Sequence, residues 1–445
     1  MRSCRRCRSS RLHAADPHCR RTRPAPCPRS AGGVQRGLTT ENLGKIDWRL
    51  RQICGHRRDH RRAVDRGMQV GVRWLVNCGS AAIHHHHVSS GKRYGRFGRS
   101  SSHSAEHYVV YLVQPRLVNE PFGDAGLLLD FSFKSRAILF DLGDLVPLPA
   151  GTISKIRQVF VSHMHMDHFA GFDRMLRLLL NRTAELQVFG PPGLTDAVEG
   201  KLRSYTWNLL DETSEDFTII AAEWNLKDEL TRSRFKARNK FGREKLGVEA
   251  LASRRLLMEP DFHVEAVALD HGIPCLAFAF QESLRVNVHK ARLDELGLPV
   301  GPWLTEAKQL VRSHADPDAI VTIPGHRDMK LGDLLSAKVL VTGPGERICY
   351  ATDLAFTEPN LSRLIALAEG SDYLFIEGGF LDEDEAIAAS KHHLTASQAG
   401  SVAAAARVVR SVPMHFSPRY LGREQLLLDE FQKGLTTGLA TRFSD

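Results

Sequence analysis

Residues 161–168 read Val-Ser-His-Met-His-Met-Asp-His, and no other stretch of this 445-residue chain says as much about its architecture. The run follows a short apolar strand, and alternation along an extended segment puts the rings of His163 and His165 on one side. Asp167 and His168 then present a second pair of polar groups. Imidazole and carboxylate are ligands that suit zinc and its first-row neighbours. The cluster can therefore hold one metal with its first half and another with its second half.

Charge and cysteine divide the chain into two unequal parts. Residues 1–100 carry 23 Lys or Arg against 5 Asp or Glu, although the whole chain has a net charge of only +9, so the remainder is mildly acidic. Residues 1–105 show no sustained periodicity and little apolar surface, so we expect a disordered basic segment there. We expect it to be upstream sequence read from an early start codon, with the functional chain beginning near Glu106. A basic arm that binds RNA is the alternative.

Residues 106–445 have the composition of a globular protein of a reducing compartment. Of the eight cysteines, only Cys275 and Cys349 lie in this part. Sparse cysteine is typical of reducing compartments. No segment approaches the roughly 20 apolar residues of a membrane span, and the basic N-terminus lacks the apolar stretch of a signal peptide. We therefore expect a cytoplasmic protein with no membrane partner.

Apolar runs bounded by turn residues predict strands in both halves of this body. The strands are predicted at residues 126–133, 137–141, 158–161, 186–189, 262–269, 275–280, 338–342, 348–351 and 373–376. Helices are predicted at 172–180, 359–368, 395–409 and 423–432. Thr395 and Gln398 have the spacing of a capping box, which favours a helix start at that point. Strands in both halves, each with helices, predict an α/β fold in which two sheets pack together with helices outside.

Three more candidate ligands each end a predicted strand, namely His271, Asp353 and His415. Ligands at strand ends can converge at one rim of a pair of sheets. Each of these residues alone has another interpretation, as a hydrogen-bonded turn residue. Together with the first cluster they make seven groups, enough for two metals with a shared bridge.

The order and spacing of these seven residues resemble the ligand order of the metallo-β-lactamase fold, a four-layer αββα sandwich. Within that fold, the chain is most similar to the ribonuclease Z family, the tRNA 3′-end endonucleases. The local segments that carry this resemblance lie within residues 120–430 and are Phe189–Gly193, Asp270–Pro274, Phe278–Phe280, Leu298–Pro302, Phe375–Phe380, His393–Thr395 and His415–Tyr420.

The resemblance implies roles for the ligands and for a catalytic pair. It assigns His163, His165 and His271 to one zinc, Asp167, His168 and His415 to the other, and Asp353 to a bridging position. It also implies that Asp167 accepts a proton from the attacking water, and that His393, with Glu377 nearby, assists the leaving oxygen. The chemistry agrees, because two adjacent cations stabilise both oxygens of a phosphodiester displacement and an imidazole can protonate the departing 3′-oxygen. For His393 the alternative is a histidine at the surface start of a helix.

Basic residues suggest where RNA could bind. Cations alternate at Arg232, Arg234, Lys236, Arg238 and Lys240, and share one face of an extended segment. They could follow a phosphate backbone, or they could be the charged protection of an edge strand.

The resemblance adds further expectations about the substrate and the assembly. It implies a substrate arm at residues 288–312 that carries Gly301 and Pro302 and grips the tRNA elbow, and we add Arg419 to the expected substrate-binding residues. It also implies a homodimer.

These observations lead to one hydrolase domain at 106–445 with two Zn²⁺ per chain, Mn²⁺ or Fe²⁺ being alternative metals. We predict that it hydrolyses RNA, removing the 3′ trailer of precursor tRNA. The first alternative is a hydrolase of a small lactone, thioester, sulfate ester or cyclic nucleotide at the same site. A basic surface near the metals would favour RNA, whereas an apolar pocket roofed by residues 201–259 would favour a small substrate. The second alternative is a non-catalytic binding protein of the same fold.

Overall fold

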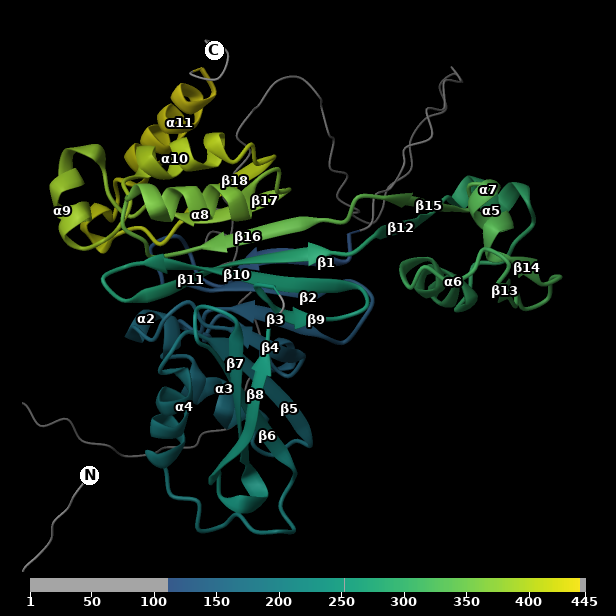
Figure 1. The fold of residues 1–445 in the computed structure, drawn as a ribbon, viewed down its shortest axis with the longest axis horizontal. Coiled ribbons are helices and arrows are strands. Elements are labelled where there is room, and N and C mark those ends of the chain that lie inside the picture. The colour runs from purple at the N-terminus through teal and green to yellow at the C-terminus, as the bar shows by residue number, and fades with distance from the viewer. Residues whose placement is uncertain (1–110, 252, 441–445) are drawn as a thin grey trace, which may run out of the picture. The chain divides into compact units, whose positions relative to one another are not determined.

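A computed structural model describes residues 111–251 and 253–440, with side chains to 438. The expected basic segment at 1–105 and the expected start near Glu106 lie outside these residues. In the described part of the chain, the main body contains two sheets (Figure 1). The first sheet has the order β1 (Val113–Leu117), β2 (Leu127–Phe131), β3 (Ala137–Phe140), β4 (Ile156–Phe160), β5 (Ala184–Gly190), β6 (Phe217–Trp224), β7 (Glu229–Lys236), β8 (Arg243–Ala250). The second has the order β18 (Arg410–Met414), β17 (Tyr373–Glu377), β16 (Arg347–Ala351), β11 (Pro274–Glu282), β10 (Phe262–Asp270), β9 (Arg255–Met258).

Helices cover the outer face of each sheet (Figure 1). The first sheet carries α1 (Ala150–Ile153), α2 (Met166–Phe169), α3 (Phe172–Leu179) and α4 (Leu194–Arg203). The second carries α8 (Glu358–Ala368), α9 (Glu385–Ser390), α10 (Ala396–Ala405) and α11 (Glu424–Ala440). The three short 3-10 helices of the described residues are η1 (Ala237–Asn239), η2 (Asp382–Asp384) and η3 (Pro418–Tyr420). This is the predicted αββα arrangement.

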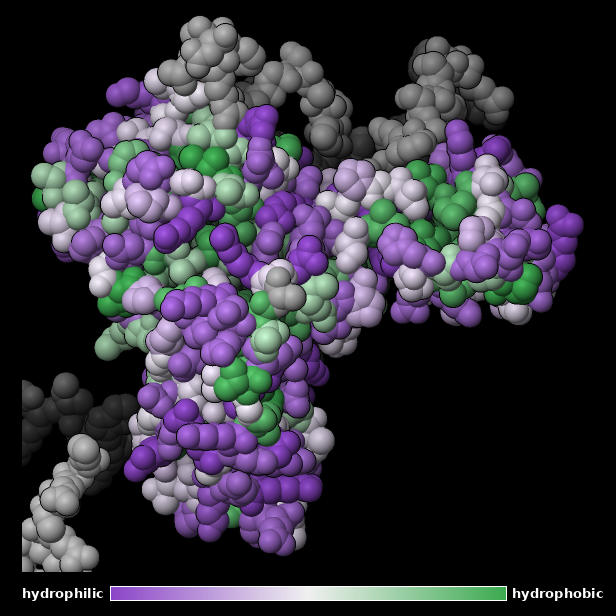
Figure 2. Space-filling view, viewed as in Figure 1, coloured by the Kyte–Doolittle hydropathy of each residue, from purple (hydrophilic) through white to green (hydrophobic). Residues whose placement is uncertain are grey.

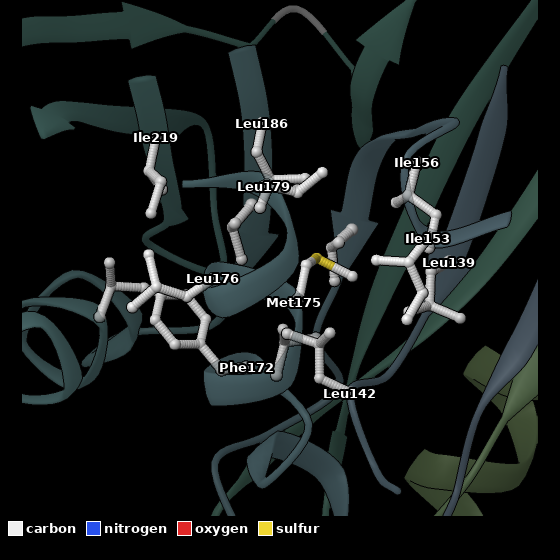
Figure 3. Close-up of a cluster of buried hydrophobic side chains, with 14 of the residues drawn as sticks. Leu139, Leu142, Ile153, Ile156, Phe172, Met175, Leu176, Leu179, Leu186 and Ile219 are labelled. Atoms are coloured by element: carbon white, nitrogen blue, oxygen red, sulfur yellow. The ribbon is translucent and has the colours of Figure 1, made fainter. Parts of the chain in front are cut away.

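Three hydrophobic clusters hold these layers together. One lies between the sheets and includes Phe140, Phe278 and Tyr350. Another lies between the first sheet and its helices, where Phe172, Met175, Leu176 and Leu179 of α3 face the strands (Figure 3). Their spacing of three and four residues makes one apolar face of a helix. A third cluster joins the second sheet to α8, α10 and α11.

Several helix and strand predictions are confirmed and some need correction. The capping box at Thr395 is present, with its side chain accepting from the Gln398 backbone N–H. The helix predicted to run to residue 409 ends at Ala405, and the one predicted to end at 432 continues to Ala440. The described residues of 201–259 end α4 and then form strands of both sheets.

An arm is inserted between β11 and β16. It contains β12 (Arg285–Val288), α5 (Lys290–Glu295), α6 (Trp303–Arg312), β13 (Ile320–Val321), β14 (Met329–Lys330), α7 (Leu331–Ser336) and β15 (Leu340–Gly343). Figure 1 shows its helices gathered beyond the paired strands β12 and β15, away from both sheets. The arm has its own apolar cluster, which includes Trp303 and Leu334. The strand predicted at 338–342 as part of the body is β15 of this arm, because an apolar run does not reveal which strand it pairs with.

Candidate metal centre

The seven predicted ligands gather at one rim of the two sheets, five of them after strands and two in the helix α2. His163 and His165 follow β4 of the first sheet, and Asp167 and His168 lie in α2. The other three follow β10, β16 and β18 of the second sheet. β11 is antiparallel to both β10 and β16, and β16 is parallel to β17, which is parallel to β18. The three ligand-bearing strands therefore run in one direction, and they end at the same rim.

The ligand atoms form two groups. Atoms of His163, His165, His271 and Asp353 lie within 4.8 Å of one another, and so do atoms of Asp167, His168 and His415. We call these the first and the second ligand group.

The Asp353 carboxylate touches both ligand groups. Its Oδ2 lies 3.6 Å from His163 Nε2 and 3.4 Å from His168 Nε2, and its Oδ1 lies 3.1 Å from His415 Nε2. The geometry thus places Asp353 between the groups, where a bridging ligand would stand.

The residues at this rim fit a metal because two buried ring nitrogens among them have no hydrogen-bond partner in the described part of the chain. The Nε2 atoms of His163 and His168 are buried and have no hydrogen-bond partner among the described residues. An unpaired buried polar atom costs about 1–3 kcal/mol, so such atoms are rare unless a ligand uses them. Burial and the neighbouring His168 lower the pKa of His163 to about 2. A neutral imidazole is the form that binds a metal.

Asp141 orients His168 from behind. Its Oδ2 accepts from His168 Nδ1 at 2.9 Å and from the Tyr350 hydroxyl at 2.9 Å, while its Oδ1 accepts from the Ser162 backbone N–H at 2.6 Å. Burial lowers the pKa of His168, but Asp353 and Asp141 outweigh it and raise that pKa. A carboxylate on one ring nitrogen leaves the other facing the metal position. Asp141 was not among the site residues predicted from the sequence, although its position at the end of an apolar strand was a signal.

The loop after β3 also supports the ligand loop. The Leu142 N–H donates to the His168 carbonyl at 2.8 Å. A Cβ added to Gly143 would lie 2.7 Å from the Asp167 carbonyl and 2.5 Å from the Ala125 carbonyl. Real Cβ atoms essentially never lie this close to another atom, so any residue other than glycine would force one of these backbone segments to move.

His393 and Glu377 form a pair beside the metal groups. His393 Nδ1 lies 2.8 Å from Glu377 Oε2 and 4.0 Å from Asp353 Oδ1. Burial lowers the pKa of His393, but the charge and hydrogen bond of Glu377 outweigh it and raise that pKa to about 9. The other Glu377 oxygen accepts from the Leu354 N–H at 2.7 Å, so this carboxylate also holds the loop after Asp353. The pair can therefore present a protonated imidazole at neutral pH.

The predicted substrate cations lie in a different setting. Arg232 and Arg234 lie in β7 and pair across to Glu249 and Glu244 of β8, at 3.0 and 2.5 Å. Arg238 lies in η1, where its Nε donates to the Ser214 carbonyl at 2.8 Å. The expectation of one extended face through residue 240 is therefore wrong, because β7 ends at Lys236 and the backbone then turns. Figure 2 shows hydrophilic residues over this end of the first sheet.

The remaining predicted residues fall in two places. Pro302 is the N-cap of α6 in the arm and Gly301 precedes it, and Trp303 Nε1 donates to the Pro299 carbonyl at 2.8 Å. Arg419 lies in η3, four residues after the candidate ligand His415, and its Nη1 is 3.8 Å from Asp384. Arg419 thus lies near a candidate ligand in the sequence. Gly301 and Pro302 instead lie in the arm, which has its own apolar cluster.

Comparison with known proteins gives several similar sequences. The sequence profile of the beta-lactamase superfamily domain matches residues 301–416. Ribonuclease Z of Deinococcus radiodurans is 32% identical over 292 residues, which cover 64% of this chain and 83% of that protein. Ribonuclease Z of Crocosphaera subtropica is 30% identical over 283 residues, 62% of this chain and 74% of that protein. Ribonuclease Z of Pyrococcus horikoshii is 27% identical over 297 residues, 64% of this chain and 79% of that protein.

Solved structures with a similar fold show lower identity. The metallo-beta-lactamase fold protein YhfI from Bacillus subtilis has a TM-score of 0.40 and 14% identity, covering 70% of this chain and 85% of that one. Human tRNase Z, short form, has a TM-score of 0.39 and 17% identity, covering 69% of this chain and 92% of that one.

No helix of the described residues is long and apolar enough to cross a membrane.

Proposed function

The chain belongs to the ribonuclease Z family, and from that premise we propose that it removes the 3′ trailer of precursor tRNA by hydrolysing one phosphodiester bond. The observation that carries this proposal is the convergence of the two ligand groups on Asp353, with the His393–Glu377 pair beside them. Family membership supports a metal-dependent hydrolase, and this arrangement supports two metal positions rather than one.

The ligand types favour zinc in both positions. His163, His165 and His271 would hold the first ion, and the second group would hold the other, with Asp353 shared. Imidazole and carboxylate are donors that zinc accepts, and Mn²⁺ and Fe²⁺ share that preference. Two bound cations would supply the positive charge that stabilises both the attacking and the leaving oxygen of the diester.

Protein groups would carry the protons of the reaction. The Asp167 side chain is 45% exposed, whereas Asp353 is 3% exposed, so Asp167 is the carboxylate that a water molecule and a substrate can reach. It would accept a proton as the water oxygen bonds to phosphorus. His393 would donate its proton to the tRNA 3′-oxygen as the bond between phosphorus and that oxygen breaks. The products would be a 3′-hydroxyl on the tRNA and a 5′-phosphate on the trailer.

RNA contacts outside the metal site complete the proposal. The arm with Gly301 and Pro302 would hold the body of the tRNA, and Arg419 would lie near the cut. Arg232 and Arg234 would add little, because their charges are matched by glutamates. The proposal includes a homodimer and a cytoplasmic location, which follow from the family resemblance.

The test uses the full chain loaded with zinc, beside an Asp167→Ala variant. Both are incubated with a 3′-extended precursor tRNA and, separately, with bis(p-nitrophenyl) phosphate. We expect a single Asp167-dependent cut at the end of the acceptor stem. Turnover of the small diester with intact precursor tRNA would overturn the tRNA assignment and keep the hydrolase. Absence of turnover on both, with zinc bound, would favour a binding protein.

A further inference from the structure

A buried amide on α8 takes no part in the proposed chemistry, yet it touches two ligand loops. Asn360 is 1% exposed and is the third residue of the helix. Its Oδ1 accepts from the Asp270 N–H at 2.9 Å, and its Nδ2 donates to the Asp270 carbonyl at 2.8 Å and to the Ala355 carbonyl at 2.9 Å. All three of these hydrogen bonds go to backbone groups.

These backbone groups stand next to two proposed metal ligands. Asp270 precedes His271, and Ala355 lies two residues after Asp353. The Ala355 N–H also donates to the Asp270 carbonyl at 2.9 Å, so the two loops and the amide form one compact network. Within the first ligand group, His271 Nε2 lies 3.5 Å from Asp353 Oδ2. The hydrogen-bond network therefore holds the backbone one residue from His271 and two residues from Asp353.

The sheet does not fix the spacing of these two loops. His271 follows β10 and Asp353 follows β16, and β11 lies between those strands. No ladder hydrogen bond of the described sheet joins β10 to β16 directly, because each pairs with β11. Beyond the strand ends, one backbone hydrogen bond joins the two loops directly, from the Ala355 N–H to the Asp270 carbonyl, and the three hydrogen bonds of Asn360 hold both loops to α8. Arg363 of the same helix donates to the Ala268 carbonyl at 3.1 Å, which ties α8 to β10 a second time.

We propose that Asn360 is a positioning residue that sets the distance between His271 and Asp353, and so the affinity of the first ligand group for its metal. This inference rests on the proposed function for its reaction, but its main consequence is metal binding. An amide is required because the site needs one acceptor and two donors. Alanine would leave buried backbone groups unpaired, and aspartate would place a carboxylate oxygen against two carbonyls. Loss of such support typically weakens metal binding by about 10–100-fold.

The experiment compares the full chain with Asn360→Ala and Asn360→Asp. Zinc affinity is measured by competition with a chromophoric chelator, and kcat and KM are measured on precursor tRNA and bis(p-nitrophenyl) phosphate. A matched control is Val198→Ala, a buried side chain of α4 in the other helical layer. We expect both Asn360 variants to bind zinc about 10–100-fold more weakly. We expect a lower kcat on both substrates, an unchanged KM for precursor tRNA, and no such change in the control.

Each outcome decides the proposal. Wild-type zinc affinity in both Asn360 variants would overturn it, and so would an equal loss of affinity in Val198→Ala at a similar loss of thermal stability. If Asn360→Ala does not fold, Asn360→Asp keeps the side-chain volume and gives the answer. If the wild-type protein leaves precursor tRNA intact, the proposed function fails, while zinc affinity and diester turnover still test Asn360.

Discussion

The metal rim and the root of the arm are held by different kinds of interaction. At the rim, Asp141 and Asn360 each make several hydrogen bonds to candidate ligands or to the loops that carry them, and Glu377 bonds to His393 and to the loop after Asp353. At the root, Glu282 and Glu346 are buried together, and Arg312 of α6 reaches Glu282 at 3.6 Å. A hydrogen-bond network whose members are all paired fixes one geometry, whereas the stability of a buried cluster of acidic and basic groups changes with the protonation of its members.

Substitutions in these two regions should therefore have different effects on activity. A change at the rim should affect every substrate, because the proposed ligands would act on the bond that is broken. A change at the root should affect only a substrate long enough to reach the arm. The small diester and precursor tRNA therefore distinguish the two regions.

Removing the proposed bridge should have the largest effect. Asp353→Ala deletes the carboxylate that touches both ligand groups, so we expect a loss of bound zinc and a fall in kcat of more than about 100-fold on both substrates. Metal content by mass spectrometry and turnover of each substrate measure this. Full zinc content with normal diester turnover would show that Asp353 does not bridge.

His393→Ala should separate the substrates by their leaving groups. We expect a fall in kcat of about 10²–10⁴-fold on precursor tRNA, because its leaving 3′-oxygen needs a proton. The p-nitrophenolate of the diester leaves without one, so its turnover should change little. Burial and the charge of Glu377 together leave the pKa of His393 at about 9, so the proton donor is present below that pH and is lost as pH rises through it. Equal losses on both substrates would contradict this role.

The convergence of the candidate ligands at one rim could be predicted from the sequence, whereas the residues that support them could not. His271 and His415 stand at the ends of apolar runs, and the direction of a strand is enough to place them at a rim. Asn360 reaches a backbone group 90 residues away. No periodicity encodes such a contact, since it depends on how α8 packs. The strand at 340–343 was misplaced for the same reason, because its partner β12 is a tertiary fact.

Arg312→Met should weaken the binding of precursor tRNA without changing turnover of the small diester. Its guanidinium also lies 3.9 Å from Asp261, and its Nε donates to the Leu284 carbonyl at 3.2 Å, so it connects α6 to the sandwich. We expect KM for precursor tRNA to rise on the order of tenfold through misplacement of the arm, with diester turnover unchanged. Arg292→Met is a control, because that exposed arginine pairs with Glu295 within α5. An equal effect of both variants would point to lost charge rather than to arm position.

Glu346→Gln should change the pH dependence of stability. Burial and the carboxylates of Asp372 and Glu282 raise the pKa of Glu346 to about 8, against the opposing charge of Arg285. The native state therefore keeps a proton that the unfolded chain releases above about pH 4.5, so stability falls as pH rises from 4.5 towards 8. Because glutamine cannot ionise, the variant should not lose stability in this pH range through position 346. We expect its free energy of unfolding to exceed that of the wild type by about 4 kcal/mol at pH 8, with little difference at pH 4.5. Urea unfolding at both pH values measures it, and a constant difference would contradict the buried-acid explanation.

The smallest effect should come from the cations of β7. Arg234 is bound to Glu244 of the edge strand β8, so its charge is already matched, as in an edge protected against pairing. We expect Arg234→Gln to leave kcat/KM on precursor tRNA within about twofold, and to leave its salt dependence unchanged. A phosphate contact would instead reduce the slope of log kcat/KM against log salt by about 1. That result would make the first sheet, and not only the arm, part of the RNA-binding surface.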